Sequence, residues 1–354
     1  MNFIRNLFKK EKANLGFWGT LQKPVIVLAP MADVTDVSFR QIFAKYGRPD
    51  VMWTEFVSAD GLCRAPRDNS NELGLTSHDI LWKDLLYFEN ERPVVAQLFS
   101  GRPEYMEQAA YEVTLKGFDG IDINMGCPDE GVQKQKAGAF LIKEPKLATQ
   151  IIEAVKKGIR RASKETGKPE IPVSVKTRLG FNTDVMEEWI THLLDAKPAV
   201  ITIHARTRKE MSKVPAKWDR VRDAVTLRDK LKSQTLIFGN GDVLDLEDAH
   251  KKAVETGADG VMIGRGIFGN PWVFNRERKG GADVTLEEKL HALVEHTHLF
   301  ETHLPHKSFN LMKKHYKAYV NGFEHAKELR ADLMEAKDAA HVERIVEEFL
   351  AEKK

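Results

Sequence analysis

Eight short runs of mainly β-branched and other apolar residues recur along residues 25–264, and stretches with helical spacing separate most of them. The runs are VIVLA (25–29), DVMWTEF (50–56), PVVAQLF (93–99), GIDIN (120–124), PVSVKT (172–177), VITIHA (200–205), TLIFG (235–239) and GVMIG (260–264). Strands that alternate with helices eight times are typical of a (β/α)8 barrel. A doubly wound sheet also alternates, but no GxGxxG follows the first run. The sequence therefore predicts an α/β fold of the (β/α)8 TIM-barrel type.

The composition changes after residue 276. From Thr285 onward the spacing is helical with no strand signal, and Thr285 followed by Glu288 forms a capping-box pattern. We therefore expect a basic N-terminal extension at residues 1–23, a barrel domain at 24–276 and an all-α helical bundle of about four helices at 285–354.

The bulk composition is that of an ordinary globular protein, with 42% hydrophobic and 30% charged residues and a net charge of +2. No apolar run approaches the roughly 20 residues that a membrane span needs. Two cysteines cannot form a disulfide framework, so we expect a reducing compartment, the cytoplasm. Residues 1–18 are basic and amphipathic without the features of a signal peptide, and we expect them to form a surface helix.

Polar residues follow every predicted strand. In a (β/α)8 barrel the carboxyl ends of the strands converge on one face, where active sites are built. Seven or eight such ends together predict an active site on that face. In chain order these ends carry Pro30-Met31, Glu55, Gln97, Asn124 with Cys127, Lys176 with Arg178, His204 with Arg206, Asn240-Gly241-Asp242 and Gly264-Arg265-Gly266.

The last two strand ends indicate a phosphate site. NGD at 240–242 and GRG at 264–266 place glycines where backbone amides can approach an anion. Barrel enzymes often bind phosphate between the loops after strands seven and eight.

The motifs resemble those of the tRNA-dihydrouridine synthase family. The matching segments are LAPMADVTDVSFR (28–40), PVVAQLF (93–99), GIDINMGCP (120–128), AGAFLIKEP (137–145), VSVKTRLG (173–180), ITIHARTR (201–208), GNGDV (239–243) and GADGVMIGRGIFGNPWVF (257–274). Three features depart from the family pattern: Asp129 and Glu130 after GCP, a long segment at 63–84, and Ala205 in place of glycine. The first two bear on RNA contacts and thus on which uridine is chosen.

The resemblance implies an FMN-dependent barrel enzyme that reduces uridines of tRNA with electrons from NADPH. It implies that Pro30, Met31 and Ala32 lie along the flavin, that Gln97 bonds the ring edge and that Lys176 stabilises the reduced ring. His204 is expected to contact the cofactor or substrate. The residues expected to hold the phosphate are Asn240, Gly241, Asp242, Gly264 and Arg265.

Cys127 is the predicted proton donor. A hydride that arrives at C6 of uracil leaves negative charge, which a proton at C5 relieves, and a thiol is mostly protonated at neutral pH. Family members use this cysteine so. Asn124 is expected to hold the uracil, and Arg178 and Arg206 are candidates for substrate or phosphate contacts. Cys63 lies outside every motif and is expected to be structural.

The segment 307–322 is the best candidate for contact with RNA. It holds Lys313 and Lys314 among further basic residues, interleaved with Tyr316 and Tyr319, which could stack on bases or pack inside. Histidines between 291 and 306 match no standard metal-ligand spacing, so no metal is expected. A monomer is the default.

Three alternatives stay open from the sequence. One is an FMN-dependent reductase of a free pyrimidine or another alkene, and a second is dihydrouridine formation in ribosomal RNA. The third is an RNA-binding protein without catalysis, against which Cys127, Lys176 and the phosphate loops argue.

Overall fold

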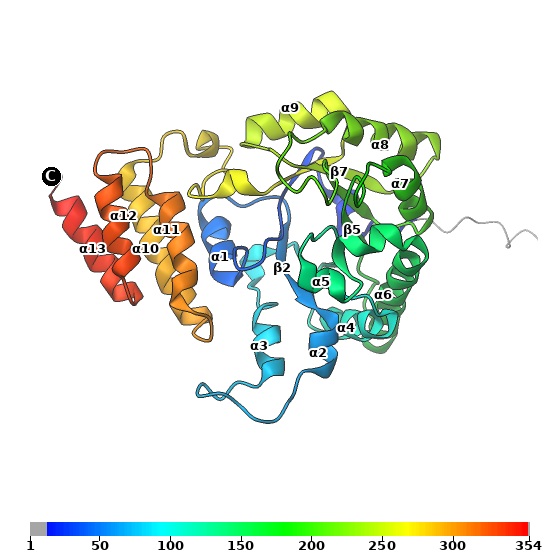
Figure 1. Cartoon of the computed structure of the whole chain (residues 1–354), viewed down its shortest axis with the longest axis horizontal. Helices are drawn as coiled ribbons and strands as arrows, with labels where there is room; N and C mark the ends of the chain where they lie inside the picture. The colour runs from blue at the N-terminus through cyan, green and yellow to red at the C-terminus, as the bar shows by residue number, and fades with distance from the viewer. Residues whose placement is uncertain (1–12, 353–354) are drawn as a thin grey trace, which may run out of the picture.

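The computed structural model describes residues 13–352 and has two parts, a barrel and a group of helices beside it (Figure 1). The strands are β1 (Val25–Leu28), β2 (Met52–Ser58), β3 (Val94–Phe99), β4 (Gly120–Met125), β5 (Val173–Arg178), β6 (Val200–His204), β7 (Leu236–Asn240) and β8 (Gly260–Ile263). The helices of the barrel are α1 (Val37–Tyr46), α2 (Ala59–Arg64), α3 (Ser77–Lys83), α4 (Pro103–Leu115), α5 (Glu130–Lys134), α6 (Pro145–Thr166), α7 (Met186–Asp195), α8 (Trp218–Lys230) and α9 (Leu246–Thr256).

The eight strands form one parallel sheet in the order β1-β8-β7-β6-β5-β4-β3-β2. An isolated parallel bridge between Val27 and Val51 joins its two ends and closes the barrel. All eight predicted strands are confirmed, with ends that differ from the prediction by at most two residues. The β-branched runs predicted these strands correctly, because parallel strands are buried on both faces and therefore consist mainly of apolar residues.

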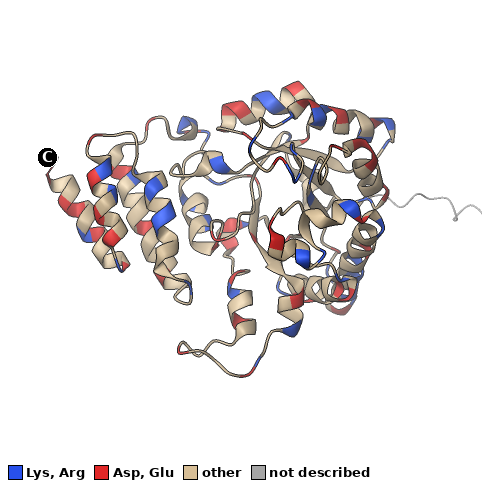
Figure 2. Ribbon diagram, viewed as in Figure 1, with Lys and Arg blue, Asp and Glu red and all other residues tan. Residues whose placement is uncertain are grey.

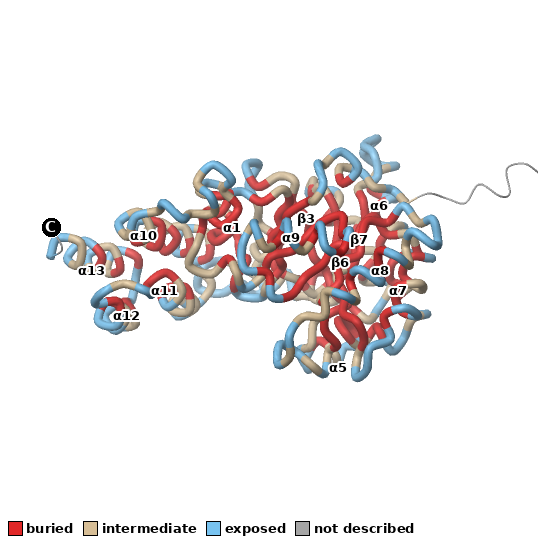
Figure 3. The backbone as a smooth tube through the Cα atoms, turned by 90° about the horizontal axis from the view of Figure 1, so that it is seen from above, coloured by how far each residue is buried: buried red, intermediate tan, exposed pale blue. Residues whose placement is uncertain are grey.

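The helices form where capping residues and an apolar stripe coincide. The long helix α6 begins at Pro145, whose fixed φ suits the first helical position, and ends at Gly167 in the left-handed conformation. Its inner face buries Ile151, Val155 and Ile159 against the barrel, and the buried interior is visible in Figure 3. The helices thus form the outer layer that holds the strands in place.

The interior of the barrel is apolar at the end away from the predicted site. Trp18, from a 3-10 helix at Gly16–Thr20, is 1% exposed and its ring centroid lies 5.5 Å from those of both Trp53 and Phe238. This part of the predicted extension at 1–23 therefore packs as barrel core. The expected surface helix falls largely on residues 1–12, which lie outside the described residues.

Four α-helices follow the barrel and pack into a second core, as predicted for the C-terminal bundle. They are α10 (Leu286–His303), α11 (Lys313–Tyr319), α12 (Ala326–Glu335) and α13 (Ala339–Ala351). Helix α10 begins with the predicted Thr285–Glu288 capping box and packs against α1 of the barrel. Tyr316 and Tyr319 are buried in this second core, so they pack inside rather than stack on bases. Within residues 13–352, no helix combines the length and apolarity that crossing a bilayer requires.

Removal of the Trp18 ring tests whether this segment belongs to the barrel. We expect Trp18→Ala to lower the free energy of unfolding by about 3–5 kcal/mol, because it leaves a cavity against Trp53 and Phe238. Urea denaturation followed by circular dichroism measures this. Gln22→Ala, at an exposed position nearby, is the control and should change it by less than about 0.5 kcal/mol. A small effect in both variants would contradict the assignment.

Candidate functional site

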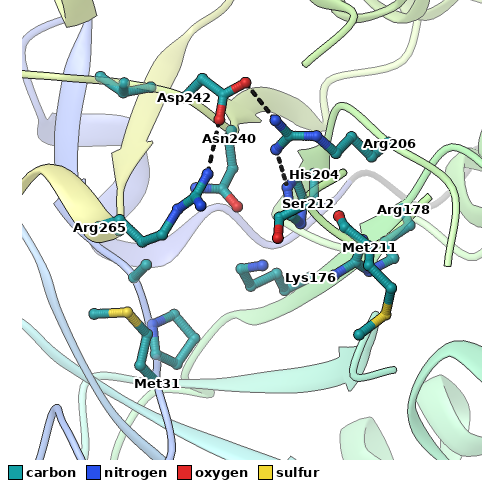
Figure 4. Close-up of a pocket in the computed structure, with 15 residues that line it drawn as sticks. Met31, Lys176, Arg178, His204, Arg206, Met211, Ser212, Asn240, Asp242 and Arg265 are labelled. Atoms are coloured by element: carbon teal, nitrogen blue, oxygen red, sulfur yellow. Dashed lines mark hydrogen bonds and ion pairs between the residues drawn. The ribbon is translucent and has the colours of Figure 1, made fainter. Parts of the chain in front are cut away.

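A cavity of about 280 Å³ lies at the carboxyl ends of the strands (Figure 4). Eleven of the predicted site residues line it. They are Pro30, Met31, Lys176, Arg178, His204, Arg206, Asn240, Gly241, Asp242, Gly264 and Arg265. The lining also includes Ala29, Met211, Ser212 and Val243, which the sequence did not single out.

The register of the sheet explains why these side chains meet. Lys176 of β5 is paired with Asn124 of β4. Arg178 is paired with His204 of β6, and His204 with Asn240 of β7. Parallel pairing without slippage therefore brings residues from four strands to the same end of the sheet.

Asp242 organises the far end of the cavity. One of its carboxylate oxygens accepts a hydrogen bond from Arg265 at 2.9 Å, and the other accepts from Arg206 and from the backbone N–H of Ala216 (Figure 4). The hydrogen bond from Arg206 lowers the pKa of Asp242. Two guanidinium groups share one carboxylate, which leaves this end of the cavity positive.

Gly241 lets this loop pass close to its neighbours. Its φ of +121° lies in the region that favours glycine, and a Cβ there would stand 2.9 Å from the Cβ of Ala216. The glycine predicted as part of a phosphate loop thus has a steric reason in the structure.

His204 is a neutral imidazole in this setting. Burial lowers its pKa well below the ordinary value, and the charges of Arg178 and Lys176 lower it further. Arg206 donates to Nε2 of His204 at 3.1 Å, so the ring proton resides on Nδ1.

Within the described residues, Lys176 supplies a cation with no carboxylate in direct contact, and the charge of Asp122 acts on it only from a longer distance. Its side chain projects between Met31 and Ser212 (Figure 4), and its ammonium makes no hydrogen bond or ion pair within residues 13–352. Burial lowers the pKa of Lys176 to about 8, and repulsion from Arg178 adds to the effect. An unpaired, half-buried ammonium favours an anionic or electron-rich ligand.

A chain of hydrogen bonds crosses the barrel interior beneath the cavity. Ser174 donates to one oxygen of Asp122 and Gln97 donates to the other, each at 2.6 Å. Asn124 in turn donates to the side-chain oxygen of Gln97 at 3.0 Å. Gln97 is fully buried, so its amide orients Asn124, and its predicted contact with the flavin stays a prediction.

Cys127 lies at the end of that chain. The side-chain oxygen of Asn124 accepts from the backbone N–H groups of Gly126 and Cys127, at 3.1 and 2.9 Å. Arg178 donates to the carbonyl of Gly126 at 2.7 Å. Burial raises the pKa of the Cys127 thiol, so the thiol is protonated at neutral pH. Cys127 and Asn124 stand beside the cavity at the β4 end and are not part of its lining.

The remaining predicted contacts lie outside the cavity. Ala32 is exposed next to Met31 and does not line it. Lys313 is partly exposed on α11, whereas the ammonium of Lys314 donates to the backbone carbonyl of Asp33 in the barrel. Within residues 13–352, no group of three His, Cys, Asp or Glu side chains is arranged to hold a metal ion.

Asp122 is the buried centre of this network, and sequence reasoning assigned it no role. The only available signal was an acid at an inward-facing position of the strand GIDIN. Its two partners come from β3 and β5, so their roles were not readable from β4 alone.

The donor set fits a flat ligand with an anionic end. Pro30 and Met31 offer apolar surface next to the loop 264–266, Lys176 offers a cation, and Arg265 with the loops 240–242 and 264–266 offers polar groups. A flavin mononucleotide has this combination of a ring system and a phosphate.

Comparison with known proteins places the chain in a family. The family model "Dihydrouridine synthase (Dus)" matches residues 27–354. A "Probable tRNA-dihydrouridine synthase" of Staphylococcus aureus (strain MRSA252) is 38% identical over 339 residues, 95% of this chain and 96% of that protein. A "Probable tRNA-dihydrouridine synthase 2" of Bacillus subtilis (strain 168) is 39% identical over 337 residues, 94% of this chain and 96% of that protein.

Among solved structures, histamine dehydrogenase from Rhizobium sp. 4-9 has a similar fold, with a TM-score of 0.51 at 12% identity over 77% of this chain and 48% of that one. The motif resemblance found in the sequence is therefore confirmed. The chain belongs to the dihydrouridine synthase family, a family of flavin-dependent oxidoreductases.

Proposed function

We propose that this protein reduces specific uridines of tRNA to dihydrouridine in the cytoplasm, with FMN as bound cofactor, NADPH as electron source and Cys127 as proton donor. One observation carries the proposal: a cationic cavity and a hydrogen-bonded cysteine turn adjoin each other at the ends of β4 and β5. The names of the relatives from Staphylococcus aureus and Bacillus subtilis support tRNA as the substrate.

FMN would be held by the cavity residues. Asn240, Gly241, Gly264 and Arg265 would bind its phosphate end, and Asp242 would orient Arg265. Pro30, Met31 and Ala32 would lie along the ring, and Lys176 would stabilise negative charge on it. When bound, the cofactor supplies a hydride to C6 of uracil and regains it from NADPH.

Cys127 completes the reduction. Its thiol gives a proton to C5 of uracil as the C5–C6 double bond is lost, and the thiolate that remains regains a proton from water. The raised pKa keeps the thiol of Cys127 protonated at neutral pH. Asn124 and Arg178 hold the cysteine turn through Gly126 and Cys127, which fixes the direction of proton transfer.

Arg206 has a supporting role in this scheme. It is 2% exposed, and its donors are directed to the Val214 carbonyl, Asp242 and His204. We assign it to the orientation of Asp242 and His204 at the cofactor site. The sequence-based expectation of a direct substrate contact stays a prediction.

The charges of the bundle favour RNA on the α11 side. Helix α11 carries Lys313 and the exposed Lys317 (Figure 2). Acidic side chains instead line the groove between α12 and α13, where a polyanion would be repelled: Glu324, Glu328, Asp332, Glu348 and Glu352. A uridine flipped out of its base stack would enter the cavity at the β4 end, where Cys127 lies.

Replacement of Cys127 tests the reaction and its acid together. We expect Cys127→Ala to lower the rate of dihydrouridine formation by about 10²–10⁴-fold, the usual contribution of general acid catalysis. The assay mixes protein, FMN and NADPH with tRNA lacking the modification and detects a gain of two hydrogens by mass spectrometry. Cys63→Ala is the matched control, because Cys63 donates to the Tyr105 carbonyl away from the cavity and should retain the rate. Equal rates in both variants would remove Cys127 from the mechanism.

The pKa of Lys176 gives a pH-dependent prediction. This pKa is lowered to about 8 in the folded protein, so Lys176 is charged below that pH and increasingly neutral above it. Binding of an anionic cofactor favours the charged form and takes up a proton there. We therefore expect the FMN dissociation constant to rise between pH 8 and 9 by up to about fivefold.

Quenching of flavin fluorescence measures this affinity. Lys176→Met should bind FMN more weakly at pH 7 and show no such rise between pH 8 and 9. The same pH dependence in the variant as in the parent would show that Lys176 does not contact the cofactor.

A further inference from the structure

Three charged side chains, of which Glu55 is buried and Lys307 and Asp84 are half-buried, link the bundle to the barrel. The ammonium of Lys307 lies 2.8 Å from Glu55 of β2 and 2.9 Å from Asp84, which follows α3. The three side chains are 12%, 6% and 23% exposed, in the order Lys307, Glu55 and Asp84. Charges are rarely buried unless their pairing fixes a geometry or serves a site.

A bulge in β2 directs Glu55 to this place. The pairing of β2 with β3 shifts between Trp53 and Phe56, so that Thr54 and Glu55 together oppose one residue of β3. Bulges of this kind re-aim a side chain next to an active site. Glu55 neither lines the cavity nor belongs to the cysteine turn, so neither of these explains its position.

The role of Glu55 is visible in its second oxygen, which accepts a hydrogen bond from the backbone N–H of Asp33. On the other side of the same residue, the ammonium of Lys314 donates to the carbonyl of Asp33. Asp33 has a φ of +54°, in the left-handed region, which residues other than glycine adopt uncommonly. Both peptide groups of this unfavourable conformation are thus held by the bundle, one directly and one through Glu55.

Asp33 stands in the middle of a tight turn at residues 31–35. The N–H of Met31 donates to the hydroxyl of Thr35 at 2.9 Å, and the N–H of Thr35 donates to the carbonyl of Met31 at 3.0 Å. Met31 lines the cavity. The position of Asp33 therefore sets the position of a cavity wall.

We propose that Lys307 and Lys314 are positioning residues of the cofactor site, which clamp Asp33 and so hold the turn 31–35 against the cavity. The bundle is then part of the cofactor site as well as a surface for RNA. The inference rests on the proposed function, because it takes the cavity to be the FMN site.

A direct RNA contact is the competing role for these lysines. The ammonium of Lys307 is enclosed by two carboxylates, and that of Lys314 is bound to a barrel carbonyl. An RNA phosphate would have to displace these partners. The geometry favours the clamp.

The test measures FMN affinity and backbone exchange in Lys307→Met. We expect the FMN dissociation constant to rise by about tenfold or more, since a displaced wall misplaces the ring. Hydrogen–deuterium exchange of residues 31–35 should become faster in both the presence and the absence of FMN. Affinity for unmodified tRNA, measured by fluorescence anisotropy, should change by less than about twofold.

Lys45→Met is the matched control. Lys45 also joins the barrel to the bundle, 2.7 Å from Glu295, but its pair is exposed and does not touch the turn 31–35. It should leave FMN affinity and exchange unchanged. Lys307→Met leaves the carboxylates of Glu55 and Asp84 without their cation, which could destabilise the fold. The double variant Lys307→Met with Glu55→Gln removes one of these charges and serves as a stability control. It should show the same loss of FMN affinity.

Several results would overturn the clamp. They are FMN affinity and exchange as in the parent, an equal loss in Lys45→Met, or a loss of tRNA affinity alone. If the parent protein bound no FMN, the proposed function would fail, and exchange at residues 31–35 would still decide whether the lysines hold the turn.

Discussion

The hydrogen bonds of the buried Asp122 carboxylate are the interactions on which the site depends. The carboxylate lies inside a barrel, where every second residue of each strand points inward and each polar group needs a partner. Its oxygens bind Ser174 and Gln97, Gln97 binds Asn124, and Asn124 fixes the turn of Cys127. Burial raises the pKa of Asp122 to about 6, and the hydrogen bonds from Ser174 and Gln97, together with the charge of Lys176, limit the rise. Cys127, the proposed proton donor, is thus positioned by a network that joins β3, β4 and β5.

The charged side chains around the cavity above this network favour an anionic ligand. Lys176, Arg178 and Arg206 are gathered around it, and Asp242 is the acid that pairs two of the arginines, Arg206 and Arg265. Burial lowers the pKa values of Lys176 and Arg178, which is the energetic cost of this arrangement. Such strain at a functional site is typical of proteins whose ligand supplies the missing charge.

The bundle uses part of the basic segment 307–322 for its own packing. A run of lysines and tyrosines at 307–322 predicted an RNA-facing helix, yet Tyr316 and Tyr319 fill its core and Lys307 is paired inside the molecule. Only part of that basic stretch is free to meet a polyanion. The acidic groove between α12 and α13 further restricts the surface on which RNA can lie.

The sequence by itself determined the barrel, because β-branched runs and capping residues act locally and repeat eight times along the chain. It also indicated eleven of the fifteen residues that line the cavity, since the ends of parallel strands always share one face. Only the tertiary structure decided their partners. Lys307 and Glu55 are 252 residues apart, and Gln97 and Asp122 lie on different strands. Such contacts depend on how α1 packs against α10 and on sheet register, which no local pattern encodes. The burial of Trp18 was not predictable for the same reason. Its ring fills space at one end of the barrel, and that space exists only in the assembled fold.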